Sequence, residues 1–398
     1  MIPRISNLAA LVSIALAPSI SPCVAQTREM QGATVACGSA EVAAVADSVA
    51  AAFDAHQFVF IGSTHGGKKA HDFLLCLLSR PAFQQRVTDV LVEWANPVHQ
   101  TLMDRYLLTL DQVPEDSLRQ VWFDTDYPQL WARLPQIPEF FAAAQAINMR
   151  LDPARRIRVL GGCEPVNWAA VRTSDDIAAS PFKTNWAAHV ITEHFAVRPD
   201  QRLLVVYGDG HIHHNGGTLM SDLEAKLDRA KLFVIGTISD LDAGESERVA
   251  LFGDPTRPSF IVARNFPSSR PYPKDLFYAG SDLLASHVDA VAYLGPDPDR
   301  DLSNSIELTE AQRAELARRD GLKGDLRRLM QLRFGHRDIW FRTHPNDIPK
   351  RLSRDTKMPV AALSNVINQP PGHNACPESR RSSPGRLDCL VSHCFDYS

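Results

Sequence analysis

Residues 57–68 read QFVFIGSTHGGK, and this stretch decides the fold of the chain. The apolar run Phe58 to Ile61 stops at Gly62, and the polar letters STHGG follow. Apolar residues return at helical spacing from Lys68 onward. The pattern predicts a buried strand, a tight polar loop and a helix. Ligands of open α/β sheets bind beside the loops that follow the carboxyl ends of the strands, so His65 is the first candidate functional residue.

Working outward, short apolar runs alternate with helical patterns along the chain. Further strands are expected at 88–93, 157–162, 202–208, 232–236, 260–263 and 288–294. Helices are expected at 40–53, 68–78, 97–110, 138–149, 183–196, 219–227 and 309–332. Strands that are apolar throughout and are separated by helices predict an α/β fold, with a mainly parallel sheet flanked by helices on both faces.

The chain is expected to have three parts. Residues 1–25 match a secretory signal peptide, because an apolar run precedes small residues, Cys23 and Ala25, at the −3 and −1 positions of a cut before Gln26. Residues 26–349 are expected to form a single α/β domain with a helical insertion at about 97–152. Within that insertion, the aromatic-rich segment 111–135 could form a lid. Residues 350–398 are expected to be a disordered or loosely packed tail.

Composition and targeting narrow the choice of compartment and partners. The signal predicts a periplasmic or secreted protein, and no later segment is long and apolar enough to cross a membrane. A formal net charge of −4 gives no reason to expect a nucleic-acid partner. Export permits disulfides, but the cysteine spacing is unlike a dense disulfide framework. Cys76 and Cys163 are therefore expected to be packed thiols. The tail holds His373, Cys376, Cys389, His393 and Cys394, whose spacing matches no standard zinc pattern.

Polar side chains follow four of the expected strands. They are His65, Glu93, Glu164 and His211. The two histidines share a local frame, because a glycine ends the strand and the histidine comes three residues later: GSTH at 62–65 and GDGH at 208–211. Carboxyl ends of parallel strands meet at one edge of a sheet, so these side chains are expected to form one site.

Two imidazoles beside a carboxylate serve two kinds of chemistry. The carboxylate of Glu93 can raise the basicity of His65 or His211, so that the imidazole activates water as a general base. Alternatively, His65, Glu93 and His211 together can ligate a divalent metal that lowers the pKa of bound water. The sequence alone leaves both readings open.

Three other motifs fit less well. Gly62, Gly67 and Lys68 match the P-loop pattern G-x-x-x-x-G-K, but Lys69 stands where that motif needs a hydroxyl. No G-x-S-x-G frame stands at a strand–helix turn, which argues against a serine hydrolase elbow. His213 and His214 could bind a metal with His211, but the favoured interpretation places both in a polar loop that faces water.

Beside these motifs, the chain resembles the superfamily of erythromycin-esterase-like proteins, haem-binding uptake lipoproteins and Tiki proteases. The resemblance rests on the paired G-x-x-H motifs with a glutamate after the second strand, and it spans about residues 55–300. Further fragments resemble the erythromycin-esterase-like branch: VEWAN at 92–96, HQxxxDRY at 99–106, GGCEPVNW at 161–168, VVYGDGH at 205–211 and DAVAYLGP at 289–296. The residue after the first glycine is Ser63, which is closer to the Tiki pattern than to the Glu of many esterase-like members.

The resemblance implies which residues act and on what. It assigns catalysis to His65, Glu93 and His211, and substrate binding to Gly62, Ser63, Arg105, Glu164 and Gly208. It implies an exported hydrolase of ester or amide bonds in a small-molecule substrate, assisted by a divalent metal in one version. The alternative is a periplasmic protein that binds haem or iron without turnover, and a third reading is a scaffold whose site is degenerate. Membership of a fold does not choose among them.

Overall fold

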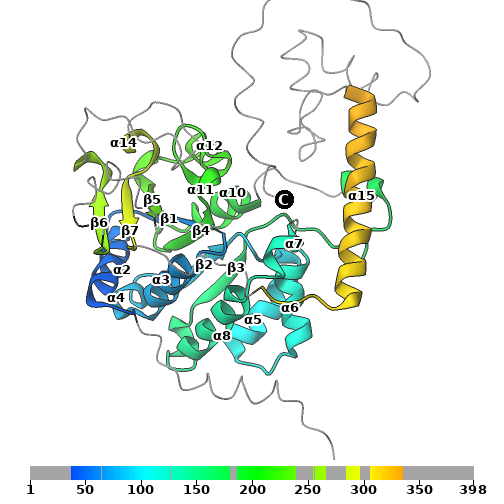
Figure 1. Ribbon diagram of the computed structural model, residues 1–398. Helices are drawn as coiled ribbons and strands as arrows, with labels where there is room; N and C mark the ends of the chain where they lie inside the picture. Colours follow the sequence, from blue (N-terminus) through cyan, green and yellow to red (C-terminus); the bar gives the residue numbers. More distant parts are fainter. Residues whose placement is uncertain are drawn as a thin grey trace, which may run out of the picture. The chain divides into compact units, whose positions relative to one another are not determined.

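The structure is a computed structural model that describes residues 37–334, apart from 64, 126, 180–185, 239–253, 255, 266–283 and 296–304 (Figure 1). The expected signal peptide and C-terminal tail lie outside these residues. Within them, the expected α/β fold with a mostly parallel sheet is confirmed.

The core of the fold is a seven-stranded sheet in the order β3-β2-β4-β1-β5-β7-β6. All neighbouring strands are parallel except β6, which is antiparallel to β7. The strands are β1 Phe58–Ser63, β2 Asp89–Val92, β3 Arg158–Gly161, β4 Leu203–Gly208, β5 Leu232–Ile238, β6 Ser259–Val262 and β7 Ala290–Tyr293. The strand predicted from residues 57–62 is thus β1, and it lies centrally between β4 and β5.

Alternate residues of the central strands face two separate cores. Val59 and Ile61 pack on one face, whereas Phe58 and Phe60 pack on the other. All four side chains are at most 4% exposed. Burial of one such side chain contributes about 1.5–3 kcal/mol, so the run from Phe58 to Ile61 fixes β1 within the sheet. This double burial explains why the strand is continuously apolar and does not alternate with polar residues.

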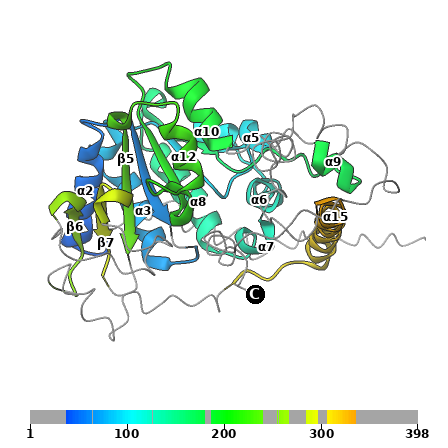
Figure 2. The same cartoon turned by 90° about the horizontal axis from the view of Figure 1, so that it is seen from above.

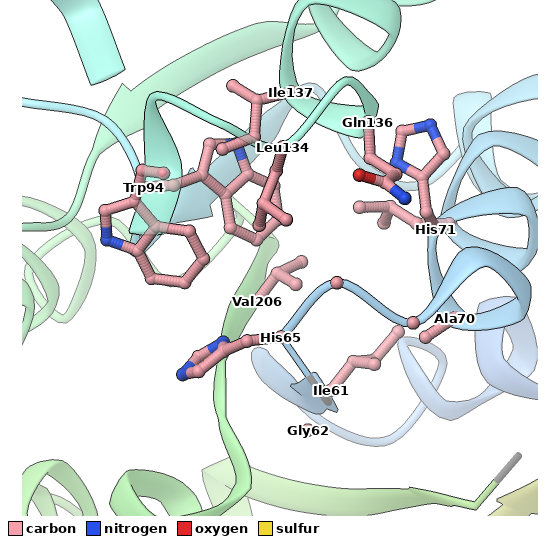
Figure 3. A pocket seen from close by; sticks show the side chains of 14 residues that line it. Ile61, Gly62, His65, Ala70, His71, Trp94, Leu134, Gln136, Ile137 and Val206 are labelled. Carbon is pink, nitrogen blue, oxygen red and sulfur yellow. The ribbon is translucent and has the colours of Figure 1, made fainter. Parts of the chain in front are cut away.

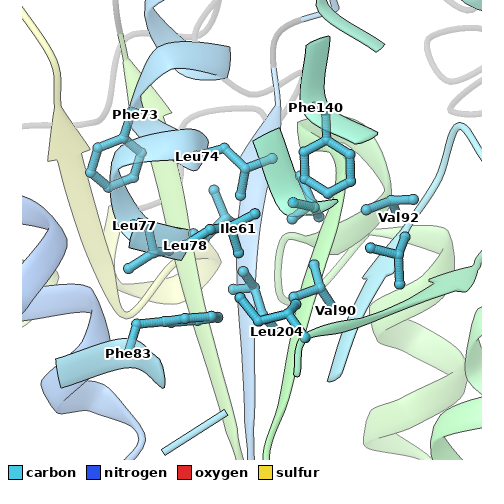
Figure 4. Packing of buried hydrophobic residues seen from close by; sticks show 14 of the residues in the cluster. Ile61, Phe73, Leu74, Leu77, Leu78, Phe83, Val90, Val92, Phe140 and Leu204 are labelled. Carbon is cyan, nitrogen blue, oxygen red and sulfur yellow. The ribbon is translucent and has the colours of Figure 1, made fainter. Parts of the chain in front are cut away.

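Helices cover both faces of the sheet. The first face packs against α2 Ala40–Ala52, α3 Lys68–Ser79, α4 Pro81–Gln84 and α8 Gln136–Asn148, and Figure 4 shows side chains of α3, α4 and α8 against β1, β2 and β4. The second face packs against α10 Trp186–Val190, the π-helix η4 Ile191–Phe195 and α12 Thr218–Glu224. Figure 1 shows these two groups on opposite sides of the strands.

Between β2 and β3 the described chain is helical, as the expected insertion at 97–152 requires. Its elements are η1 Pro97–His99, α5 Gln100–Asp104, the π-helix η2 Arg105–Thr109, α6 Glu115–Phe123, α7 Pro128–Trp131, α8 and η3 Pro153–Arg155. Within the segment 111–135, Trp122 is 1% exposed and Trp131 is 4% exposed, so both aromatic residues are packed into the core.

The long helix α15 Glu310–Phe334 is held by a buried arginine. It lies beside α9 Ser174–Ala179 in both Figure 1 and Figure 2. The guanidinium of Arg319 lies over the rings of Phe123 and Trp168, and its Nη2 donates to Asp124 Oδ1 at 2.6 Å. An arginine that is 3% exposed requires such partners, so α15 is tied to the helical insertion. Among the described helices, α15 included, none is long and apolar enough to cross a membrane.

The prediction for one cysteine is wrong. Cys76 forms a disulfide with Cys37, which joins the residues before α2 to the middle of α3. Cys163 is a buried thiol, as predicted. The spacing of two cysteines separated by 39 residues carries no signal for pairing, because it is the packing of α2 on α3 that brings them together.

Candidate functional site

The site lies where the chain reverses its direction across the sheet. β1 and β4 are neighbours, and their register pairs Ser63 with Gly208, so the two strands end at the same level. The loop after β1 leads to α3 on the first face, whereas the segment after β4 leads to α12 on the second face. Neighbouring strands whose connections leave toward opposite faces leave a crevice between them, which is the usual ligand site of an open α/β sheet.

Glu93 and His65 converge on Gly208 in this crevice. The backbone N–H of Gly208 donates to Glu93 Oε2 at 2.7 Å. A Cβ atom on Gly208 would lie 3.1 Å from His65 Nε2 and 3.4 Å from Glu93 Oε2. Since β2 is the other neighbour of β4, and Val92 pairs with Val206, Glu93 follows its strand at this same edge. Glycine at position 208 therefore leaves room for an imidazole and a carboxylate to face the same point.

His211 completes the group from the opposite side. It lies on α11 Asp209–Ile212, a single turn of helix, where a loop was predicted. Its Nε2 lies 3.6 Å from Glu93 Oε1, and its Nδ1 lies 2.8 Å from the hydroxyl of Thr218. Because a carboxylate only accepts, we assign a proton to Nε2 and let the Thr218 hydroxyl donate to Nδ1. The 3.6 Å gap exceeds a hydrogen bond, and such contacts often tighten when substrate binds.

The protonation of His65 suits a base. Surrounding protein atoms desolvate part of the His65 ring, and this desolvation lowers the pKa of His65 below the usual 6.5. The negative charge of Glu93 acts in the opposite sense, and His211 adds to the lowering. The side chain is nevertheless exposed on one side, while its ring packs edge-on against Trp131 at 4.6 Å between centroids. A neutral imidazole that solvent can reach is able to accept a proton.

Asp209 is a site residue that the sequence reasoning missed. A Cβ atom on Gly62 would lie only 1.6 Å from Asp209 Oδ1, so this carboxyl fills the space beside β1. Oδ1 is buried without a hydrogen-bond partner. Burial, with Glu93 nearby, raises the pKa of Asp209 to about 7. The only sequence signal was its position directly after a strand-ending glycine, in the same segment as His211.

The remaining predicted residues are placed differently. Ser63 ends β1 and is paired in register with Gly208. Glu164 lies beyond β3, at the far side of β2, where its Oε1 accepts from the backbone N–H of Trp186 at 3.3 Å. The structure does not bring Arg105 to the site. It forms an exposed ion pair with Asp111, and its neighbour Asp104 binds Arg158 at the beginning of β3, which is the opposite end of the sheet.

His213 and His214 do not face water, so the interpretation of that loop is wrong. They are 8% and 2% exposed. His214 is held by Glu224 at 2.6 Å and by Asp289 at 3.1 Å, and these bonds explain its burial. Among the described residues, no three His, Cys, Asp or Glu side chains are grouped so that they could hold a metal ion.

An apolar pocket adjoins His65 (Figure 3). We call it the His65 pocket; it is lined by Ile61, Gly62, His65, Gly66, Gly67, Ala70, His71, Leu74, Trp94, Trp131, Leu134, Gln136, Ile137 and Val206. Its volume is about 50 Å³. A reacting group near His65 therefore has an apolar recess beside it.

Comparisons with known proteins give only distant likenesses. No protein-family model matches the chain, and no curated protein matches it. Among solved structures, the type III effector HopBA1 is 17% identical with a TM-score of 0.35, over 63% of this chain and 92% of that chain. ChaN of Campylobacter jejuni, a protein with cofacial haem binding, is 11% identical with a TM-score of 0.31, over 62% of this chain and 90% of that chain. Values this low carry no conclusion about what the present protein binds or cleaves.

Proposed function

We propose that this protein is an exported hydrolase of ester or amide bonds that uses His65, Glu93 and His211. The observation that carries the proposal is the convergence of His65 and Glu93 on Gly208, at the crevice between β1 and β4, with His211 Nε2 3.6 Å from Glu93 Oε1. Such a group supplies a base, a means of orienting it and a proton donor within one solvent-accessible site.

His65 is proposed as the general base. Its lowered pKa keeps the imidazole neutral near pH 7, so it can take a proton from a water molecule. The water oxygen then bonds to the carbonyl carbon of the substrate, and the carbonyl electrons move to oxygen. When the tetrahedral intermediate collapses, the bond to the leaving alcohol or amine breaks, and His65 returns its proton to that group.

Glu93 and His211 are proposed to stabilise this proton transfer. Glu93 is fixed by the Gly208 N–H, and its negative charge favours the protonated form of His65. His211, held by Thr218, presents an N–H toward the same crevice and can donate to the developing oxyanion. Because its pKa is raised to about 7, Asp209 carries less negative charge near neutral pH, where an oxyanion forms, than an ordinary aspartate does.

The Cys37–Cys76 disulfide supports an exported location. Disulfides persist in oxidising compartments and are rare in the cytosol. The charge pattern and small residues of the first 25 positions point the same way. We therefore expect the mature protein to begin near Gln26, in the periplasm or outside the cell.

The test is hydrolysis by the purified mature protein across a panel of aryl and alkyl esters and anilides, with and without a chelator. His65→Ala is expected to lower kcat by about 10²–10⁴-fold, and Glu93→Gln and His211→Ala by about tenfold or more. The matched control is His56→Ala, because His56 bonds to Ala230 O away from the crevice. Wild-type kcat/KM in the His65 variant would refute the proposal.

A second candidate is haem binding without turnover. The observation in its favour is that His65 combines a neutral imidazole with exposure at the sheet edge, as an axial ligand requires. The His65 pocket cannot enclose a haem at about 50 Å³, so haem would contact His65 from the solvent side. A Soret band that appears on adding haemin and is lost in His65→Ala would establish this candidate. An unchanged haemin spectrum would eliminate it.

A further inference from the structure

The His65 pocket has an apolar wall with a polar end. Trp94, Trp131, Leu134 and Ile137 contribute the apolar wall, and each is at most 7% exposed. They come from the segment after β2, from α7, from the link between α7 and α8, and from the start of α8. His65 borders the pocket on the side of the crevice. A substrate with its reacting carbonyl near His65 would thus place a neighbouring group between indole rings and aliphatic side chains.

The polar end consists of His71 and Gln136. Figure 3 shows both on the side of the pocket away from His65. Gln136 Oε1 is buried without a hydrogen-bond partner. His71 has a side chain only 9% exposed, and its Nε2 lies 3.5 Å from Glu139 Oε2. Buried polar atoms are nearly always bonded in proteins, so the orphaned Gln136 Oε1 at this end of the pocket indicates a ligand group or water that binds there.

The size of the pocket limits what enters it. Its volume is about 50 Å³. A cavity of about 10–15 Å³ holds one water molecule, so the His65 pocket admits only a short group of a few non-hydrogen atoms. A long acyl chain is too large for it.

We propose that the His65 pocket binds one specific part of the substrate: a short aliphatic chain of about three carbons that ends in a hydroxyl group. The chain contacts Trp94, Trp131 and Leu134. The hydroxyl donates to Gln136 Oε1. The position of the scissile carbonyl near His65 rests on the proposed function. The binding of the aliphatic chain of the ligand in the His65 pocket does not depend on that function.

Two matched ligands test the binding. Butyl methyl sulfone and 3-hydroxypropyl methyl sulfone each carry four non-hydrogen atoms beyond the sulfone, and neither has a bond that the enzyme can hydrolyse. Binding is followed by ¹⁹F NMR of 5-fluorotryptophan-labelled protein, with the Trp94 and Trp131 signals assigned from Trp→Phe variants. The hydroxyl ligand is expected to shift both signals and to bind about fivefold tighter than butyl methyl sulfone. This factor is the gain in affinity expected from one net hydrogen bond. Octyl methyl sulfone is expected to leave both signals in place.

Variants distinguish the pocket from general apolar binding. Gln136→Leu removes the acceptor and is expected to abolish the preference for the hydroxyl ligand. Gln129→Leu is the matched control, because Gln129 is exposed on α7 and does not line the pocket. An unchanged preference in Gln136→Leu, or no shift of either tryptophan signal in wild type, overturns the inference. Ester hydrolysis without sulfone binding would refute only the proposed ligand of the His65 pocket. Sulfone binding without hydrolysis would refute only the proposed function.

Discussion

Asp209→Asn offers a test of the site that does not depend on any substrate. The side chain keeps its size but loses its ability to ionise. Asp209 has a pKa of 3.8 when solvated and about 7 in the folded protein, because burial and Glu93 both oppose its negative charge. Between these values the folded state holds a proton that the unfolded state has released. The contribution of Asp209 to the free energy of unfolding must then fall as pH rises from about 4 to about 7, and change no further above that range.

The magnitude follows from the size of the pKa difference. About three pH units at about 1.4 kcal/mol each give an upper limit of about 4 kcal/mol. Asp209 is only half-buried as a residue, and solvent on its exposed side stabilises part of the charge. We therefore expect Asp209→Asn to become more stable relative to the wild type by about 2 kcal/mol between pH 4.5 and pH 8.

The assay is urea unfolding of both proteins at several pH values, since the difference between them cancels the titration of every other group. The carboxyl of Asp176 provides a control, because it is exposed and accepts from the backbone N–H groups of Arg172 and Thr173, which lower its pKa. Asp176→Asn should show no gain of stability with rising pH. If the stability difference between Asp209→Asn and wild type is independent of pH, the carboxyl is not held protonated, and our account of this side of the site is wrong.

Three further predictions concern the disulfide and the histidines. Replacing Cys37 and Cys76 with Ser removes a cross-link across 39 residues and should lower the free energy of unfolding by about 4 kcal/mol, measured by urea unfolding against wild type with and without reductant. The lowered pKa of His65 means that its base form persists to acid pH, so the acidic limb of kcat/KM for an ester should have its midpoint below 6.5; a midpoint above 6.5 would contradict the assignment. Thr218→Val removes the hydroxyl that holds His211 and should lower kcat about 10–100-fold with little change in melting temperature, whereas equal loss of both would indicate a structural role only.

The sequence by itself determined the helices and strands, and it indicated that the functional site lies at the carboxyl-terminal edge of the sheet. Phe58 to Ile61 could be recognised as a fully buried strand, because hydrophobic runs bounded by glycine are local signals. The same reasoning located every other strand of the described sheet to within a few residues. It also placed His65, Glu93 and His211 at strand ends, since the carboxyl ends of parallel strands share one edge.

Only the tertiary structure decided how these residues meet. The insertion of β4 between β1 and β2 puts Gly208 between His65 and Glu93, and strand order depends on contacts between distant segments that no local pattern encodes. Arg105 was misplaced for the same reason, because its helix ends up at the opposite end of the sheet. The raised pKa of Asp209 is likewise a product of burial against Gly62, and the Cys37–Cys76 bond is a product of helix packing. Burial and proximity belong to the folded chain as a whole, whereas periodicity and turn residues can be read one segment at a time.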